Sequence, residues 1–122
     1  MKLEFDSPLD YTTGAAIDPT TLASLAYTVF IDTVNPPVKS YPVASSAVAN
    51  ATTNANGTKH ITVDCVAGDA TGFTPIPGTK YFCAVQDSVS EGGTPVLSAE
   101  SPVIEYTYDL TPTAPANFGV GS

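Results

Sequence analysis

Apolar and polar residues alternate along much of this chain, and proline, glycine or asparagine interrupts the alternation every few residues. Alternation with a period of two is typical of half-buried β-strands, and the interrupting residues are typical of turns. Strands are therefore predicted over residues 2–6, 25–32, 38–43, 59–66, 79–87 and 102–108, and a further one over 116–120. Short strands with this punctuation predict an all-β fold, an antiparallel two-sheet β-sandwich of about seven strands.

Two segments depart from the alternating pattern. Residues 19–26 predict a single helical turn, with Asp18 as its N-cap. Residues 44–58 are low in complexity and carry no large apolar side chain after Val48. They are predicted to form a flexible connecting loop that ends in a tight turn at Asn56 and Gly57.

The chain length favours a single domain, and the net charge argues against two classes of partner. The chain has 122 residues, which we divide into a domain over residues 1–110 and a proline-rich segment over 111–122. It carries twelve acidic residues, four lysines and no arginine, for a net charge of −8. This charge repels phosphate backbones and anionic lipids, so neither nucleic acid nor a membrane is an expected partner.

The first residues carry two acids and no apolar stretch of the kind found in signal peptides. Three origins are compatible with this start. The protein stays in the cytoplasm where it is made, it leaves the cell by lysis, or a leader has been removed.

Residues 77–85 (PGTKYFCAV) resemble the corner between the fifth and sixth strands of fibronectin type III domains. The resemblance implies a tyrosine corner, in which Pro77 and Gly78 form the turn and the inward Tyr81 bonds a main-chain group through its hydroxyl. Three other segments resemble the family in its own order: 5–17, 25–30 and 98–103. The resemblance covers most of residues 3–108 and implies a fibronectin type III, immunoglobulin-like sandwich. The family's tryptophan is missing here, and Phe5 stands in its place.

The family's first strand has no counterpart at the start of this chain, which begins directly at the second strand. Residues 112–120 (PTAPANFGV) resemble that first strand instead. An assembly strand carrying Ala116, Phe118 and Val120 is therefore expected near the C-terminus. It docks on its own domain as a circular permutation, adds to a neighbouring subunit and drives polymerisation, or is a linker or a disordered remnant.

Cys65 and Cys83 occupy inward-facing positions of neighbouring predicted strands. Cys83 follows Tyr81 by two residues, where immunoglobulin domains place their second core cysteine. Two interpretations stay open: a disulfide that clamps the two sheets, or two buried free thiols.

No combination of residues points to a catalytic site, a cofactor or a metal site. His60 is expected at the surface, and solvated side chains are expected for the carboxylates Asp6, Asp10, Asp18, Asp64, Asp69 and Asp87. Phe82 and Tyr106 or Tyr108 are expected to face outward. They would form either a contact patch or simple cross-strand pairs on the sheet.

These features predict a non-catalytic module that works through protein partners, by self-association or within a lattice. We expect a bacteriophage virion protein, either a capsid decoration protein or a subunit of a tail or fibre. The alternative is an adhesive or carbohydrate-binding module of a bacterial surface protein or extracellular filament. An enzyme is not expected.

Overall fold

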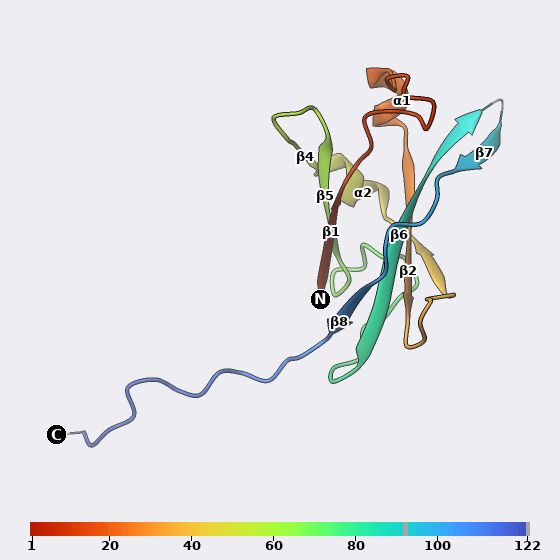
Figure 1. Cartoon of the computed structure of the whole chain (residues 1–122). Helices are drawn as coiled ribbons and strands as arrows, with labels where there is room; N and C mark the ends of the chain where they lie inside the picture. Colours follow the sequence, from red (N-terminus) through yellow and green to blue (C-terminus); the bar gives the residue numbers. More distant parts are fainter. Residues whose placement is uncertain (92, 122) are drawn as a thin grey trace.

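The computed structural model describes residues 1–91 and 93–121 and consists of two antiparallel β-sheets packed as a sandwich (Figure 1). Its elements are β1 (Lys2–Asp6), α1 (Pro19–Ala23), β2 (Ala26–Asp32), β3 (Ser40–Pro42), α2 (Ser45–Ala49), β4 (Thr52–Thr53), β5 (Lys59–Asp64), β6 (Lys80–Glu91), β7 (Thr94–Leu97) and β8 (Ile104–Thr107). The smaller sheet has the order β1-β5-β4. The larger has the order β3-β2-β6-β7, and β8 also pairs with β6. The predicted all-β, two-sheet sandwich is confirmed.

The core lies between the sheets and comes from the alternate, inward positions of their strands. Leu3, Ile61 and Val63 contribute from the smaller sheet, and Val29 and Ile31 from the larger. Burial of each such side chain stabilises the fold by about 1.5–3 kcal/mol relative to leaving it in water. The register of β1 with β5, from Lys2 opposite Asp64 to Asp6 opposite His60, keeps every apolar residue of β1 on the core side.

β6 is the central strand of the larger sheet. One side pairs with the whole of β2, and the other pairs with β8 near its start and with β7 near its end. The hairpin partner β7 was not predicted. It lies at the surface, with Val96 and Leu97 exposed, so the alternation that marks a half-buried strand is absent there.

The turn before β6 has the geometry of a tyrosine corner. Gly78 adopts φ +80°, a conformation that side chains with a Cβ rarely adopt. Tyr81 is buried, and its hydroxyl accepts a hydrogen bond from the Ile76 N–H at 2.9 Å. The Gly78 N–H donates to the Tyr108 carbonyl at 2.7 Å, which ties the corner to the end of β8.

The short helix α1 begins where the sequence predicts it. Asp18 is its N-cap, and one carboxylate oxygen accepts from the Thr21 N–H at 2.9 Å. This hydrogen bond, and a second from the Thr21 hydroxyl, lower the pKa of the Asp18 carboxyl.

The segment 44–58 is more ordered than the predicted flexible loop. It forms α2 and β4, and Ala47 of α2 is buried. Small residues such as Ala and Ser carry too little apolar signal to reveal a one-turn helix that is stabilised by tertiary packing. The predicted turn at Asn56 and Gly57 is confirmed, because Gly57 has φ +89° and its N–H donates to the Asn54 carbonyl.

The C-terminal segment leaves the sandwich after β8 and extends away from it (Figure 1). Residues 108–121 form no strand in the structure, in contrast to the strand predicted over 116–120. Phe118 is 99% exposed and Val120 is 104% exposed. Their docking on this or a neighbouring subunit stays a prediction.

Candidate assembly site at an open edge of the sandwich

One edge of the smaller sheet is open. β1 pairs with β5 on one side, and no strand among the described residues pairs with its other side. The Ser7 N–H donates to the Lys59 carbonyl at 2.8 Å, and the Cys65 N–H donates to the Met1 carbonyl at 2.9 Å. Hydrogen-bonded pairs alternate along an antiparallel ladder, so the odd-numbered residues of β1 bond to β5. The main-chain N–H and C=O groups of Lys2, Glu4 and Asp6 therefore face the open side.

A groove runs beside this edge, between β1 and the border of the larger sheet. Its volume is about 310 Å³, and its lining is largely apolar: Leu3, Glu4, Phe5, Val29, Cys83, Ala84, Val85, Ser101, Pro102 and Ile104. The lining thus comes from the inner faces of both sheets. The two sheets therefore leave a gap beside β1.

The exposure of Ile104 shows that the groove lies on the inner face of the larger sheet and lacks a covering side chain. It stands opposite Cys83 in the ladder between β8 and β6, and opposed residues of an antiparallel pair point to the same face. Cys83 is buried, whereas Ile104 is 54% exposed. An inward-facing isoleucine with this exposure lacks a neighbour that would cover it.

The register of β8 overturns the predicted patch of outward aromatics. Tyr106 stands opposite Tyr81, so it faces the core, and Tyr108 is buried. Phe82 points to the other face, opposite Glu105, and lies 5.4 Å from the Lys80 ammonium. The prediction counted inward positions from Val103, but the paired strand begins at Ile104, and a shift of one residue exchanges the two faces.

Residues 98–103, between β7 and β8, form no strand beside β6. Two serines of this segment accept hydrogen bonds from β6 instead. The Val85 N–H donates to the Ser101 hydroxyl at 2.9 Å, and the Asp87 N–H donates to the Ser98 hydroxyl at 3.0 Å. These hydroxyls replace main-chain acceptors on that side of β6. The segment contributes Ser101 and Pro102 to the wall of the groove.

The exposed C-terminal tail, residues 110–121, has the composition of a strand that lacks a partner. Ala116, Phe118 and Val120 alternate with Asn117 and Gly119, so one face is apolar. No residue of the tail is charged, although the whole chain has a net charge of −8. The sequence singled out these three residues, but it gave no sign of the groove, which depends on the spacing of strands distant in the chain.

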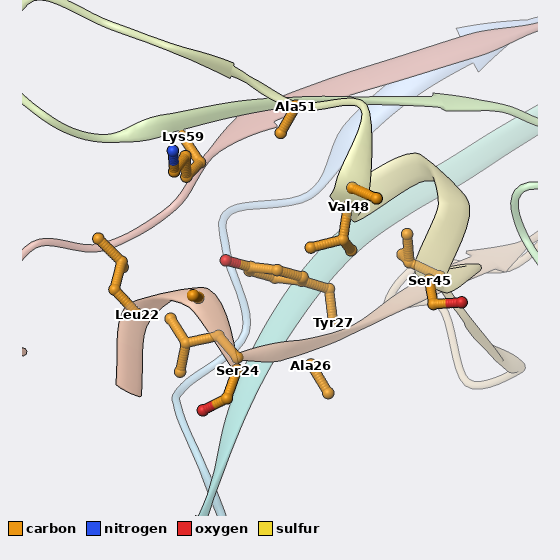
Figure 2. Close-up of a pocket in the computed structure, with 12 residues that line it drawn as sticks. Leu22, Ser24, Ala26, Tyr27, Ser45, Val48, Ala51 and Lys59 are labelled. Atoms are coloured by element: carbon orange, nitrogen blue, oxygen red, sulfur yellow. The ribbon is translucent and has the colours of Figure 1, made fainter. Parts of the chain in front are cut away.

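A second cavity lies at one end of the sandwich, between α1 and α2 (Figure 2). Its volume is about 500 Å³. Figure 2 shows the Tyr27 ring lying across it, between Leu22 on the side of α1 and Val48 on the side of α2. Burial raises the pKa of the Tyr27 hydroxyl to about 12, and the nearby Asp87 charge adds to this. The hydroxyl therefore stays protonated at neutral pH.

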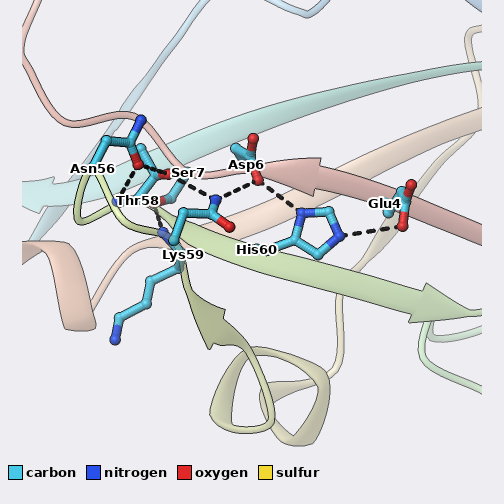
Figure 3. Close-up of polar contacts among 8 residues, drawn as sticks. Glu4, Asp6, Ser7, Asn56, Thr58, Lys59 and His60 are labelled. Carbon is cyan, nitrogen blue, oxygen red and sulfur yellow. Dashed lines mark hydrogen bonds and ion pairs between the residues drawn. The ribbon is translucent and has the colours of Figure 1, made fainter.

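His60 has two carboxylate partners on the outer face of the smaller sheet (Figure 3). Its Nδ1 lies 2.8 Å from an Asp6 oxygen, and its Nε2 lies 3.2 Å from a Glu4 oxygen. The Asp6 hydrogen bond is the main reason why the pKa of His60 is raised, followed by the Glu4 hydrogen bond. The same bond to His60, with a second from Asn54, lowers the pKa of Asp6. His60 is thus at the surface, as predicted, but it joins two strands.

The cysteines Cys65 and Cys83 are buried free thiols in the structure. Burial raises the pKa of each thiol to about 11, which keeps both protonated and unreactive at neutral pH. The alternative of a disulfide stays a prediction for the oxidised protein.

Several of the predicted solvated carboxylates instead accept local main-chain hydrogen bonds. Asp64 accepts from the N–H groups of Val66 and Ala67, and Asp69 accepts from the Asp64 N–H. No cluster of three metal-ligating side chains occurs among the residues that the structure describes. Over residues 1–91 and 93–121, no helix has the length and apolar character needed to span a bilayer.

No protein-family model, no curated protein and no solved structure matches this chain.

Proposed function

We propose that this protein is a non-catalytic structural module that assembles with further copies of itself through protein–protein contacts. The observation that carries the proposal is the exposed, uncharged tail, in which Phe118 and Val120 stand almost entirely in water. Exposed aromatic and β-branched side chains in a regular pattern are costly for a monomer and are typical of contact surfaces.

The setting that we propose is the virion of a bacteriophage, with the protein as a capsid decoration protein or a tail or fibre subunit. The resemblance of residues 3–108 to a fibronectin type III sandwich supports this setting, because small modules of this kind serve as spacers and connectors. The low content of charged residues, 13%, also suits a subunit packed among many copies.

A non-catalytic role is supported by the environment of the candidate acid–base group. His60 lies on the face of a sheet between two carboxylates, not in a cavity. Among the described residues, no hydroxyl or thiol is hydrogen-bonded to its ring, which a nucleophile activated by histidine would need.

The test is the mass of the full-length protein by sedimentation velocity over a wide concentration range, with electron microscopy of the concentrated sample. We expect species larger than a dimer that increase with concentration. A mass that stays monomeric throughout would contradict self-assembly.

The second candidate, a carbohydrate-binding module, is favoured by one observation, the cavity between α1 and α2. Tyr27 and Lys59 provide polar groups within a largely apolar lining. Titration with a panel of bacterial glycans, followed by NMR shifts of the residues around Tyr27, tests it. The absence of shifts at this cavity would remove the candidate.

A further inference from the structure

We propose that residues 116–120 of one copy add as a strand to the open side of β1 in a second copy, with Phe118 and its apolar neighbours filling the groove. The proposal rests on the assembly function given above and identifies both of its surfaces. Strand addition to an exposed sheet edge is an established mode of protein association, in which main-chain hydrogen bonds supply affinity and alternate side chains supply specificity.

The first argument is the hydrogen-bonding capacity of the edge. The N–H and C=O groups of Lys2, Glu4 and Asp6 face the open side, as the register with β5 requires. β1 has five residues, and the segment 116–120 has the same number. An added strand of this length, with Asn117 opposite Asp6 and Gly119 opposite Glu4, can therefore bond the open main-chain groups of both residues.

The second argument is the match between the apolar faces. The groove exposes Ile104 from β8 and is bordered by Leu3 and Phe5 from β1. A strand at the edge of β1 that follows the same alternation would direct Ala116, Phe118 and Val120 into this groove. Asn117 and Gly119 would then point outward beside Glu4 and Asp6, where they bring neither charge nor bulk.

The third argument is direction, which favours a second copy over the chain's own groove. In Figure 1, β1 runs upward from the N-terminus, whereas β8 runs downward into the tail. To reach its own groove, the tail would have to reverse after β8 and run parallel to β1. In a second copy with the same orientation, a tail that keeps the direction of β8 would enter the groove antiparallel to β1, the arrangement with the more stable ladder.

The fourth argument is charge. The bodies of two copies repel each other, because each chain carries a net charge of −8. The tail from Leu110 to Gly121 contains no acidic residue, so it can approach the acidic side chains of β1 without added repulsion. Because the tail and the groove are different surfaces, the contact is heterologous, and it can be repeated from copy to copy.

The test uses two full-length variants that each lose one surface. The tail variant carries Phe118→Ser with Val120→Ser, and the groove variant carries Ile104→Asp. Val38→Ser and Ile76→Asp are matched controls, because both residues are exposed apolar side chains outside the tail and groove. We expect each variant alone to sediment as a monomer and both controls to assemble like the unmodified protein.

The decisive measurement is an equimolar mixture of the tail variant and the groove variant. One intact tail then meets one intact groove, so we expect a 1:1 heterodimer with about twice the mass of either variant, and no larger species. Glu4→Pro is a second groove-side variant, since it removes an outward N–H at an edge position that tolerates proline, with Glu4→Ala as its control. Far-UV circular dichroism and thermal melting confirm that each variant folds.

Three outcomes would overturn the inference. If the unmodified protein assembles and the tail or groove variants assemble equally well, the contact is wrong while the assembly function stands. If the mixture stays monomeric, the tail does not bind this groove. If the unmodified protein is monomeric and Phe118→Ser lowers its melting temperature, the tail fills its own groove, and self-assembly fails as well.

Discussion

The central strand β6 of the larger sheet and the edge strand β1 of the smaller sheet differ in how fully their main chains are bonded. β6 has partners on both sides, and where its last partner is interrupted the hydroxyls of Ser98 and Ser101 accept its N–H groups. β1 has a partner on one side only, and its inner face borders a groove of about 310 Å³. The difference indicates that the open edge is not a general looseness of the fold but a local feature beside a well-bonded sheet.

The largest expected effect is the difference in the free energy of unfolding between a substitution in the core and one in the tail. Ile61 is fully buried between the sheets, so Ile61→Ala should lower the free energy of unfolding by about 2–5 kcal/mol. Phe118→Ala should leave the free energy of unfolding of the monomer within about 0.5 kcal/mol, because the side chain contacts nothing that folding buries. Urea denaturation at low protein concentration measures both. A large loss for Phe118→Ala under these conditions would place the tail within the monomer's own core.

A smaller effect is expected at the tyrosine corner, which lies in the sheet whose central strand β6 is bonded on both sides. Tyr81→Phe removes the acceptor of the Ile76 N–H and should cost about 1–3 kcal/mol. Tyr11→Phe, in the loop after β1, is the control and should have little effect. Chemical denaturation of both variants checks the difference. Equal stability of the two would mean that solvent replaces the Tyr81 hydroxyl without loss, and that the corner is not a rigid part of the fold.

The smallest effect concerns the outer face of the open sheet, where His60 joins β5 to β1. The folded-state pKa of His60 is raised, so its contribution to stability is complete below about pH 6.5 and disappears as the pH rises through the folded pKa. The pKa of Asp6 is lowered, so its contribution is present above about pH 4 and disappears as the pH falls through its folded pKa. The cluster should therefore stabilise β1 most between about pH 4 and 6.5.

The measurement is the melting temperature of the native protein and of His60→Gln from about pH 4 to about pH 8. We expect a small difference between the two that is largest in the acidic part and shrinks toward pH 8. A difference that grows with pH would contradict the sign. NMR titration of the His60 ring protons gives the raised pKa directly.

The strands could be predicted because their apolar residues alternate over a buried face. For β1 even the bounds agree, since Leu3 and Phe5 stand between charged residues and Ser7 with Pro8 ends the run. The face of β8 was predicted wrongly, because no residue type marks where its pairing with β6 begins. Single-residue shifts of this kind are settled by the partner strand and not by the strand's own sequence.

The tail and the groove, which are the two surfaces of the candidate site, also differ in how far the sequence reveals them. The tail is visible in the sequence, because Phe118 and Val120 alternate with small residues after a proline-rich hinge. The groove is not visible, because Leu3, Val85 and Ile104 come from three strands far apart in the chain and are ordinary core residue types. The decisive property of Ile104, that it points inward and is still exposed, exists only in three dimensions.

The hinge between β8 and the apolar part of the tail sets how close two linked copies come. Residues 109–115 can span up to about 23 Å when extended. At physiological ionic strength electrostatic forces between exposed charges fade over about 8 Å. Two strongly acidic bodies joined through this extended hinge can therefore remain outside each other's field, so added salt should change the strength of their connection little.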